Sequence, residues 1–239
     1  MPLPTIETPT YELKLPSSSK KVRYRPFLVK EEKVLIIALE SKNQSEITTA
    51  VTEVLKKCIL TKGVDVDSLP TFDIEYLFLN IRGKSVGETI DVNIICPDDE
   101  KTSVKVAIDL DDIKVQKTEN HTNKVQLDEN LMMELKYPSL DEFIKNNFDF
   151  KDENAMEQSF KLIASCIDKI YTDEEVWVAG DCTRKEITEF LESMNSQQFK
   201  KIEEFFTSMP KLSHTIKVKN PNTKVESEVV LEGLASFFG

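Results

Sequence analysis

Four cysteines and two histidines are the residues of this chain with the widest range of chemistry. Successive cysteines lie 38, 70 and 16 positions apart, so none has the C-x-x-C spacing of a structural zinc site. The six positions are Cys58, Cys96, Cys166, Cys182, His121 and His214. We therefore expect no metal ion and interpret the cysteines as reduced thiols.

Cys182 is the thiol best placed for nucleophilic chemistry. It directly precedes Thr183, which with Glu186 forms the Thr-x-x-Glu pattern of a helix capping box. A helix N-terminus lowers the pKa of a nearby thiol, but the carboxylate of Asp181 opposes that effect, and no sequence feature brings a histidine base to it. A thiol enzyme using Cys182 is thus an alternative that we rank below a structural cysteine.

Four acidic pairs and one glycine motif could also take part in catalysis or in phosphate binding. The acidic pairs are adjacent in sequence, so their side chains diverge instead of forming a general acid and base. They are Asp98-Asp99, Asp111-Asp112, Asp152-Glu153 and Glu174-Glu175. Gly83-Lys84-Ser85 spells the end of a phosphate-binding loop, yet Phe78 stands where that loop needs its first glycine. We expect no cofactor, no catalytic residue and no enzyme activity.

Composition excludes further classes. The 239 residues are 40% hydrophobic and 31% charged, with a formal net charge of -11, which disfavours binding to nucleic acid. No apolar run approaches the roughly 20 residues of a membrane span, and the N-terminus lacks the order of a signal peptide. We expect no membrane partner and a chain that is cytoplasmic at synthesis.

Charge is distributed unevenly along the chain. Residues 1–40 hold seven basic groups against five acidic ones, whereas residues 141–193 hold fourteen acidic groups against six basic ones. Such polarity suits electrostatic docking to a partner or to a second copy, although two solvated faces would give the same pattern.

The elements that position these residues follow from hydrophobic periodicity. Five prolines and three consecutive serines predict an extended arm over residues 1–30, in which Tyr11, Leu13 and Leu15 alternate as in a half-buried strand. Helices are predicted from Glu31, over residues 47–59 and over residues 71–84. Alternation over residues 90–110 predicts a β-hairpin, and further short strands up to residue 137 predict a small antiparallel sheet between about residues 89 and 137.

Helices return after Pro138. Apolar spacing predicts helices over residues 156–170, 183–194 and 199–209, and residues 216–231 predict a second hairpin around Asn220-Pro221-Asn222. The fold class is therefore α+β, with helical segments alternating with small antiparallel ribbons. We expect domains at residues 1–30, 31–137 and 138–239, the last two being similar halves by duplication or by convergent hairpin patterns.

Aromatic and cationic side chains near both ends are the candidate partner-binding residues. A planar cation, aromatic rings and a fixed proline suit contact with another protein, although a solvated hinge has a similar pattern. These residues are Tyr11, Tyr24, Arg25, Pro26, Phe27, Phe237 and Phe238. The terminal phenylalanines fit docking on another chain or on their own body equally well. Trp177 could anchor an interface, but core packing is the preferred interpretation.

Several proline-punctuated segments resemble the T4-type bacteriophage baseplate protein family. The resemblance is carried by Leu3-Pro4, Glu7 to Tyr11, Leu15-Pro16-Ser17, Tyr24 to Glu32, Leu69 to Phe78, Arg82 to Gly87, Met209 to Leu212 and Gly233 to Phe238. It spans nearly the whole chain.

The resemblance implies a structural role in the central hub of a contractile-tail baseplate, through binding to other hub proteins or to itself. The same family also includes transient hub assembly factors, which act as chaperones or catalysts of assembly and are absent from the mature virion, so the resemblance implies this role as the alternative. It implies assembly in the host cytoplasm and a place in the virion tail. Some relatives carry cysteine pairs in the ribbons that suggest metal sites, whereas here Cys96 stands alone and the second ribbon has Asn220-Pro221.

Overall fold

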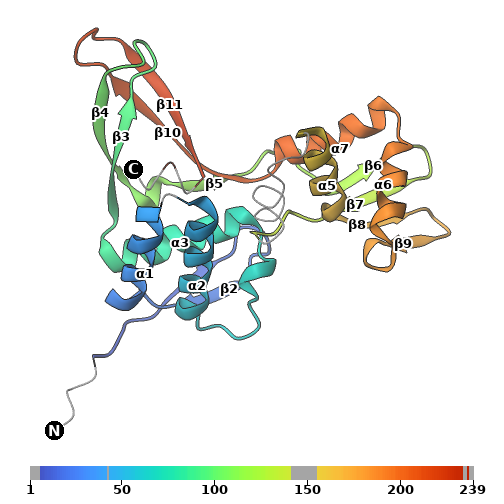
Figure 1. Ribbon diagram of the computed structural model, residues 1–239, viewed down its shortest axis with the longest axis horizontal. Helices are drawn as coiled ribbons and strands as arrows, with labels where there is room; N and C mark the ends of the chain where they lie inside the picture. The colour runs from blue at the N-terminus through green and yellow to red at the C-terminus, as the bar shows by residue number, and fades with distance from the viewer. Residues whose placement is uncertain (1–5, 42, 141–154, 234–235, 237–239) are drawn as a thin grey trace. The chain divides into compact units, whose positions relative to one another are not determined.

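The chain folds as α+β, as predicted, in two compact units (Figure 1). The computed structural model describes residues 6–41, 43–140, 155–233 and 236. Unit 1 comprises Met1–Gln116 and Lys211–Gly239, and unit 2 is Lys117–Pro210. This division differs from the boundaries that we expected at residues 30 and 137. The arm belongs to unit 1, and the C-terminal hairpin returns to it.

Unit 1 begins with a short hairpin followed by helices. Its first elements are β1 (Tyr11–Lys14), β2 (Lys21–Tyr24), α1 (Val29–Ser41), α2 (Gln44–Cys58), the short 3-10 helix η1 (Val66–Ser68) and α3 (Thr71–Val86). The side chain of Asn43 caps α2 by accepting a hydrogen bond from the Ser45 N–H. Helix α3 follows Pro70 and is ended by the C-cap residue Gly87, whose φ of 138° suits glycine. The predicted helices are thus confirmed here.

Two long hairpins complete unit 1. Their elements are β3 (Thr89–Ile95), β4 (Ser103–Asp109), the 3-10 helix η2 (Leu110–Asp112), β5 (Lys114–Gln116), β10 (Lys211–Lys219) and β11 (Glu226–Glu232). Strand β10 pairs with β11 on one side and with β5 on the other. Because β10 pairs with β5, the second hairpin is part of unit 1. It is therefore separate from helices α6 (Arg184–Glu192) and α7 (Ser196–Ser208), which precede it in sequence.

Both hairpins contribute to one hydrophobic core. Alternate residues of β3, such as Ile90 and Val92, are buried together with alternate residues of β10, such as Ile216 and Val218. Leu79 of α3 joins the same cluster, and the hairpins lie side by side in Figure 1. The two similar ribbons therefore pack against each other in one unit. They do not belong to the two separate helix-plus-ribbon halves that we expected.

Polar side chains connect the tips of the two hairpins. Asn220, which is 1% exposed, donates from Nδ2 to both carboxylate oxygens of Asp98 at 3.0 Å. The Thr223 hydroxyl donates to the same carboxylate, and Asn222 Nδ2 donates to Thr102 Oγ1 at 3.0 Å. These hydrogen bonds from Thr223 and Asn220 hold the pKa of Asp98 below its usual range.

Acid is expected to weaken this contact. Since the folded-state pKa of Asp98 lies below its unfolded value of about 3.9, the carboxylate stabilises unit 1 above that pH. This stabilisation is lost as pH falls through the folded pKa. Between about pH 5 and about pH 2.5, the melting temperature should fall less in Asp98→Asn than in the unsubstituted chain. Asp91→Asn on the same hairpin is the control, and parallel curves for Asp98→Asn would contradict the prediction.

Unit 2 is a four-stranded antiparallel sheet with helices. Its elements are β6 (Lys124–Gln126), β7 (Met132–Leu135), α5 (Ala155–Cys166), β8 (Ile167–Tyr171), β9 (Val176–Val178), the 3-10 helix η3 (Ala179–Asp181), α6 (Arg184–Glu192) and α7 (Ser196–Ser208). The strand order is β6-β7-β8-β9. The single sheet expected over residues 89–137 is therefore wrong, because its strands are shared among three different sheets.

The predicted helix over residues 156–170 is also too long. Helix α5 ends at Cys166, and Ile167 begins strand β8, which pairs with β7. Ile167 and Ile170 fit the helical spacing by coincidence: three positions apart, they would face opposite sides of a regular strand, but the pairing register shifts between Glu134 and Leu135, so both reach the core face. By contrast, the capping box of Thr183 and Glu186 forms as predicted at the start of α6.

The core of unit 2 lies between one face of the sheet and its helices. Buried members include Met133 of β7, Ile163 of α5, Leu191 of α6 and Ile202 of α7. Among the described helices of both units, none is long and apolar enough to cross a membrane.

Candidate partner-binding surfaces

The predicted partner-binding residues of the arm lie mostly inside unit 1. Tyr24 is 2% exposed and Phe27 is 8% exposed, and Pro26 is buried between them in sequence. Backbone bonds join this stretch to the end of α2, because the Arg25 N–H donates to the Cys58 carbonyl at 3.0 Å. The rings of Tyr24 and Phe27 are therefore used for packing, and a direct contact of these two rings with a partner stays a prediction.

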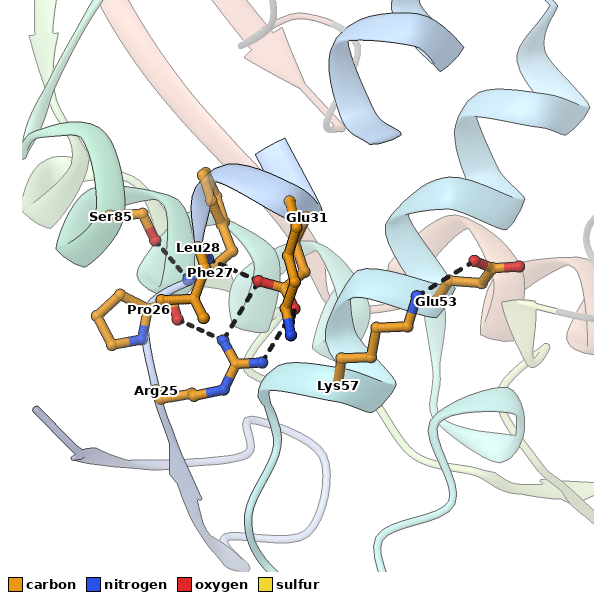
Figure 2. Close-up of polar contacts among 9 residues, drawn as sticks. Arg25, Pro26, Phe27, Leu28, Glu31, Glu53, Lys57 and Ser85 are labelled. Carbon is orange, nitrogen blue, oxygen red and sulfur yellow. Dashed lines mark hydrogen bonds and ion pairs between the residues drawn. The ribbon is translucent and has the colours of Figure 1, made fainter. Parts of the chain in front are cut away.

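Arg25 and Glu31 form a buried ion pair at this place (Figure 2). Arg25 Nη2 lies 3.1 Å from Glu31 Oε1, and the side chains are 16% and 2% exposed. Arg25 Nη1 also donates to the Pro26 carbonyl at 2.9 Å. Glu31 Oε2 accepts from the Leu28 N–H at 2.7 Å, so the carboxylate caps the start of α1.

Burial and hydrogen bonds shift the pKa of Glu31 in opposite directions. Burial by itself would raise it, but the hydrogen bonds from Arg25 and Leu28 outweigh burial and hold the pKa below its usual range. The Phe27 N–H donates to Ser85 Oγ of α3 at 2.9 Å, so the stretch is tied to α3 as well.

Tyr11, like Arg25, keeps a partly exposed side chain. Its ring lies 5.8 Å from the ring of Tyr24, and Lys84 Nζ lies 5.7 Å from its ring centroid. The structure therefore brings Tyr11, Tyr24, Arg25, Pro26 and Phe27 together in one unit. Phe237 and Phe238 lie outside the described residues.

Sequence reasoning missed an apolar surface on α1. Val29 is 79% exposed, Ile37 is 58% exposed and Ile36 is 49% exposed, whereas Leu35 and Ala38 are buried. A helix with apolar residues at consecutive positions cannot bury all of them against one neighbour. The uninterrupted run from Val34 to Leu39 was the signal for such a surface.

A second missed surface is strand β9 of unit 2. Val176, Trp177 and Val178 are 62%, 43% and 44% exposed, so core packing is the wrong interpretation of Trp177. The strand lies at the edge of the sheet, and this position removes the neighbour that would have covered the ring.

The residues considered for catalysis are not assembled into a site. Cys182 is half-buried, and its thiol contacts the Val178 carbonyl at 3.5 Å. His121 instead bonds Ser208 Oγ at 2.9 Å and the Tyr137 hydroxyl at 3.0 Å, and burial lowers its pKa. In the parts of the chain that the structure describes, no group of three His, Cys, Asp or Glu side chains could hold a metal ion.

The glycine motif is part of a helix. Gly83, Lys84 and Ser85 lie in α3, where the Ser85 hydroxyl donates to the Ile81 carbonyl at 2.6 Å. A Cβ on Gly83 would lie 3.1 Å from Leu110, so this glycine permits close packing of α3. The backbone therefore does not have the loop conformation that cradles phosphates.

Thiol reactivity should separate Cys182 from the other cysteines. Cys58, Cys96 and Cys166 are at most 1% exposed, and burial raises the pKa of Cys58 to about 11. With Ellman's reagent, we expect one thiol to react rapidly in the native chain and the other three only after unfolding. Cys182→Ser should remove the rapid phase, and a rapid phase that persists in this variant would contradict the prediction.

Comparison with known protein families gives a match over nearly the whole chain. Residues 8–239 match the family model described as T4 bacteriophage base plate protein. This range includes every described strand and helix of both units. No curated protein and no solved structure matches the chain.

Proposed function

The chain belongs to the T4 bacteriophage base plate protein family, and from this premise we propose that it is a structural component of the central hub of a contractile-tail baseplate. It acts there by binding other hub proteins during tail assembly. The observation that carries this proposal is the family match, which extends through both units. The resemblance of the proline-punctuated segments supports the placement in the hub.

Exposed apolar surfaces support a role in protein binding. Strand β9 and the outer face of α1 carry large apolar side chains that are 43% to 79% exposed, among them Val29 and Trp177. Apolar side chains of this size gain free energy when a partner covers them, and aromatic anchors are frequent at protein interfaces. Copies of the same chain and other baseplate proteins are both candidate partners.

We further propose that the protein works without catalysis. The support is the environment of Cys182, whose thiol donates to the Val178 carbonyl, while His121 is engaged by Ser208 and Tyr137. Phage carrying Cys182→Ser should assemble tails at the rate of the parent. A loss of tail assembly with normal folding of this variant would favour the thiol enzyme instead.

An assembly factor is the alternative within the same family. Such a protein would act in the host cytoplasm, as a chaperone or catalyst of hub formation, and leave before the particle is complete. The exposed surfaces of α1 and β9 suit it equally, because a transient partner would cover them in turn.

Quantitative mass spectrometry of purified particles and of infected-cell lysate tests the two roles. A fixed number of copies per particle would support the structural component. Abundance in lysate together with absence from purified particles would contradict it and favour the assembly factor.

A further inference from the structure

Strand β9 is an open edge of the sheet in unit 2. It pairs with β8 through Ile170 opposite Trp177, and the strand order places no described strand on its other side. In Figure 1 it lies at the end of this sheet, beyond β8. Edge strands with exposed apolar side chains and no charge within them are ready templates for a further strand.

The register tells which backbone groups point outward. The Thr172 N–H donates to the Glu175 carbonyl at 2.8 Å, which makes this pair a hydrogen-bonded one. Because such pairs alternate along an antiparallel ladder, Trp177 bonds to Ile170, while the N–H and C=O of Val176 and Val178 face the outer edge. The Val178 carbonyl has the weak thiol contact of Cys182. The same carbonyl precedes the 3-10 helix η3 and accepts its first bond, so a further strand could hydrogen-bond to the N–H and C=O of Val176 and to the N–H of Val178.

Both faces of the sheet offer apolar contact to such a strand. Val176 and Val178 share one face with Tyr171 and Met132, in register across β9, β8 and β7. Trp177 lies on the opposite face with Ile170. An incoming segment with alternating apolar side chains would thus find apolar neighbours on each face.

The surroundings of β9 are strongly acidic. Residues 167–192 carry eight carboxylates and three cationic side chains. Lys169 is paired with Glu134 and Lys185 with Glu189. The carboxylates flanking the strand, Asp173, Glu174, Glu175 and Asp181, have no ion pair with any described residue.

This charge argues against a second copy at the same edge. Two β9 strands paired about a twofold axis at Trp177 would bring the Asp173–Glu175 turn of one copy beside Asp181 of the other. Like charges opposed across strands are destabilising, and carboxylates with no internal cation favour a cationic partner.

We propose that β9 is a docking edge for an extended segment of a partner protein, apolar at its centre and carrying Lys or Arg at its ends. The segment would add a fifth strand to the sheet, with its cations beside the carboxylates that flank β9. The inference rests on the proposed function for the existence of a partner protein. Its test is independent of whether the chain stays in the particle.

The position of Trp177 makes the test direct, because it is the only tryptophan of the chain. Full-length protein is titrated with the peptide KKVTVTVKK, with EEVTVTVEE, and with KKVTPTVKK, whose central proline cannot form the ladder. We expect the first peptide alone to shift the Trp177 emission to shorter wavelength in a saturable way. Raising the salt from about 0.05 M to about 0.5 M should weaken binding on the order of tenfold.

Charge reversal gives the matched variants. Glu174→Lys with Glu175→Lys should weaken binding of KKVTVTVKK on the order of tenfold, because both exposed carboxylates flank β9. Glu226→Lys with Glu228→Lys, on the edge strand β11 of unit 1, should leave it unchanged. The far-ultraviolet circular dichroism of both variants should equal that of the parent.

Four outcomes would overturn the proposal. They are no emission shift with KKVTVTVKK, an equal shift with the acidic or the proline peptide, unchanged affinity in the Glu174 and Glu175 variant, and a shift that follows protein concentration without peptide. The last result would make a second copy the occupant of the edge.

Discussion

Removing residues 1–27 is expected to unfold unit 1. The deletion takes away Pro26 and five larger buried apolar side chains, and burial of each of the five stabilises a fold by about 1.5 to 3 kcal/mol. They are Leu13, Leu15, Val22, Tyr24 and Phe27. Their combined contribution, roughly 10 kcal/mol, is as large as the whole stability of a typical domain. A chain of residues 28–239 should therefore lose the cooperative melting transition of unit 1 in circular dichroism.

Polar contacts of the arm point to the same result. The Ser17 N–H donates at 3.0 Å to the carboxylate of Asp73, a residue of α3 with no exposed surface. The backbone of β2 also bonds to Leu60 just after α2. Deletion would remove the Ser17 donor from the buried carboxylate of Asp73 and the Arg23 carbonyl from the Leu60 N–H.

A shorter deletion provides the control. A chain that begins at residue 10 keeps every described buried residue of the arm and should melt like the full chain. If instead the chain of residues 28–239 melts cooperatively at the original temperature, the arm is a removable strap. Its residues would then be free to bind a partner, as the sequence analysis considered.

Local signals in the sequence predicted individual elements well. The capping box of Thr183 and Glu186 places the start of α6, because these residues act within one turn of the helix. Alternation in β3 and β10 predicted both hairpins for a similar reason, since turn residues and period two are local properties.

Pairing between distant segments was not predictable in this way. Nothing in the three residues of β5 indicates that they pair with β10, which lies nearly a hundred residues later. The same holds for the hydrogen bonds between Asp98 and Asn220 at the hairpin tips. Contacts of this kind depend on how the chain closes in space, so the domain boundaries expected from composition differ from the observed units.

Candidate interface residues were the hardest to predict. Aromatic rings and arginine occur in cores as well as at interfaces, and in the arm Tyr24 and Phe27 are buried in the core. Trp177 was the opposite case, because its exposure depends on β9 being the last strand of its sheet. The order of strands in a sheet is not encoded in any one strand.

Arg25→Ala is expected to destabilise unit 1 by about 3 kcal/mol. The substitution leaves the carboxylate of Glu31, which is 2% exposed, without its guanidinium partner. Removing one member of a buried ion pair is costly because the remaining charge is poorly hydrated, and the exposed Lys30, whose Nζ lies 3.7 Å from Glu31 Oε1, would neutralise it only in part. Urea unfolding, followed by circular dichroism, measures the change as a shift in midpoint at constant slope.

The exposed pair of Lys57 and Glu53 in Figure 2 is the control for this substitution. Their side chains are 54% and 56% exposed, and the charged atoms lie 3.7 Å apart on one face of α2. Lys57→Ala should therefore cost less than about 0.5 kcal/mol. The double variant with Arg25→Ala and Glu31→Gln should be more stable than Arg25→Ala alone, since the introduced amide oxygen would still accept the bond from Leu28 without a buried charge.

The pH dependence separates a lost charge partner from lost packing. In Arg25→Ala, burial of Glu31, the largest influence on its pKa, would be opposed only by the Leu28 N–H and by Lys30, so the pKa of this carboxyl should rise above its unfolded value. A raised folded-state pKa stabilises below the unfolded pKa, and that contribution is lost as pH rises. The deficit of Arg25→Ala should hence shrink as pH is lowered from about 7.5 toward about 5. A deficit that is constant over this range would assign the effect of Arg25 to packing of its aliphatic stem.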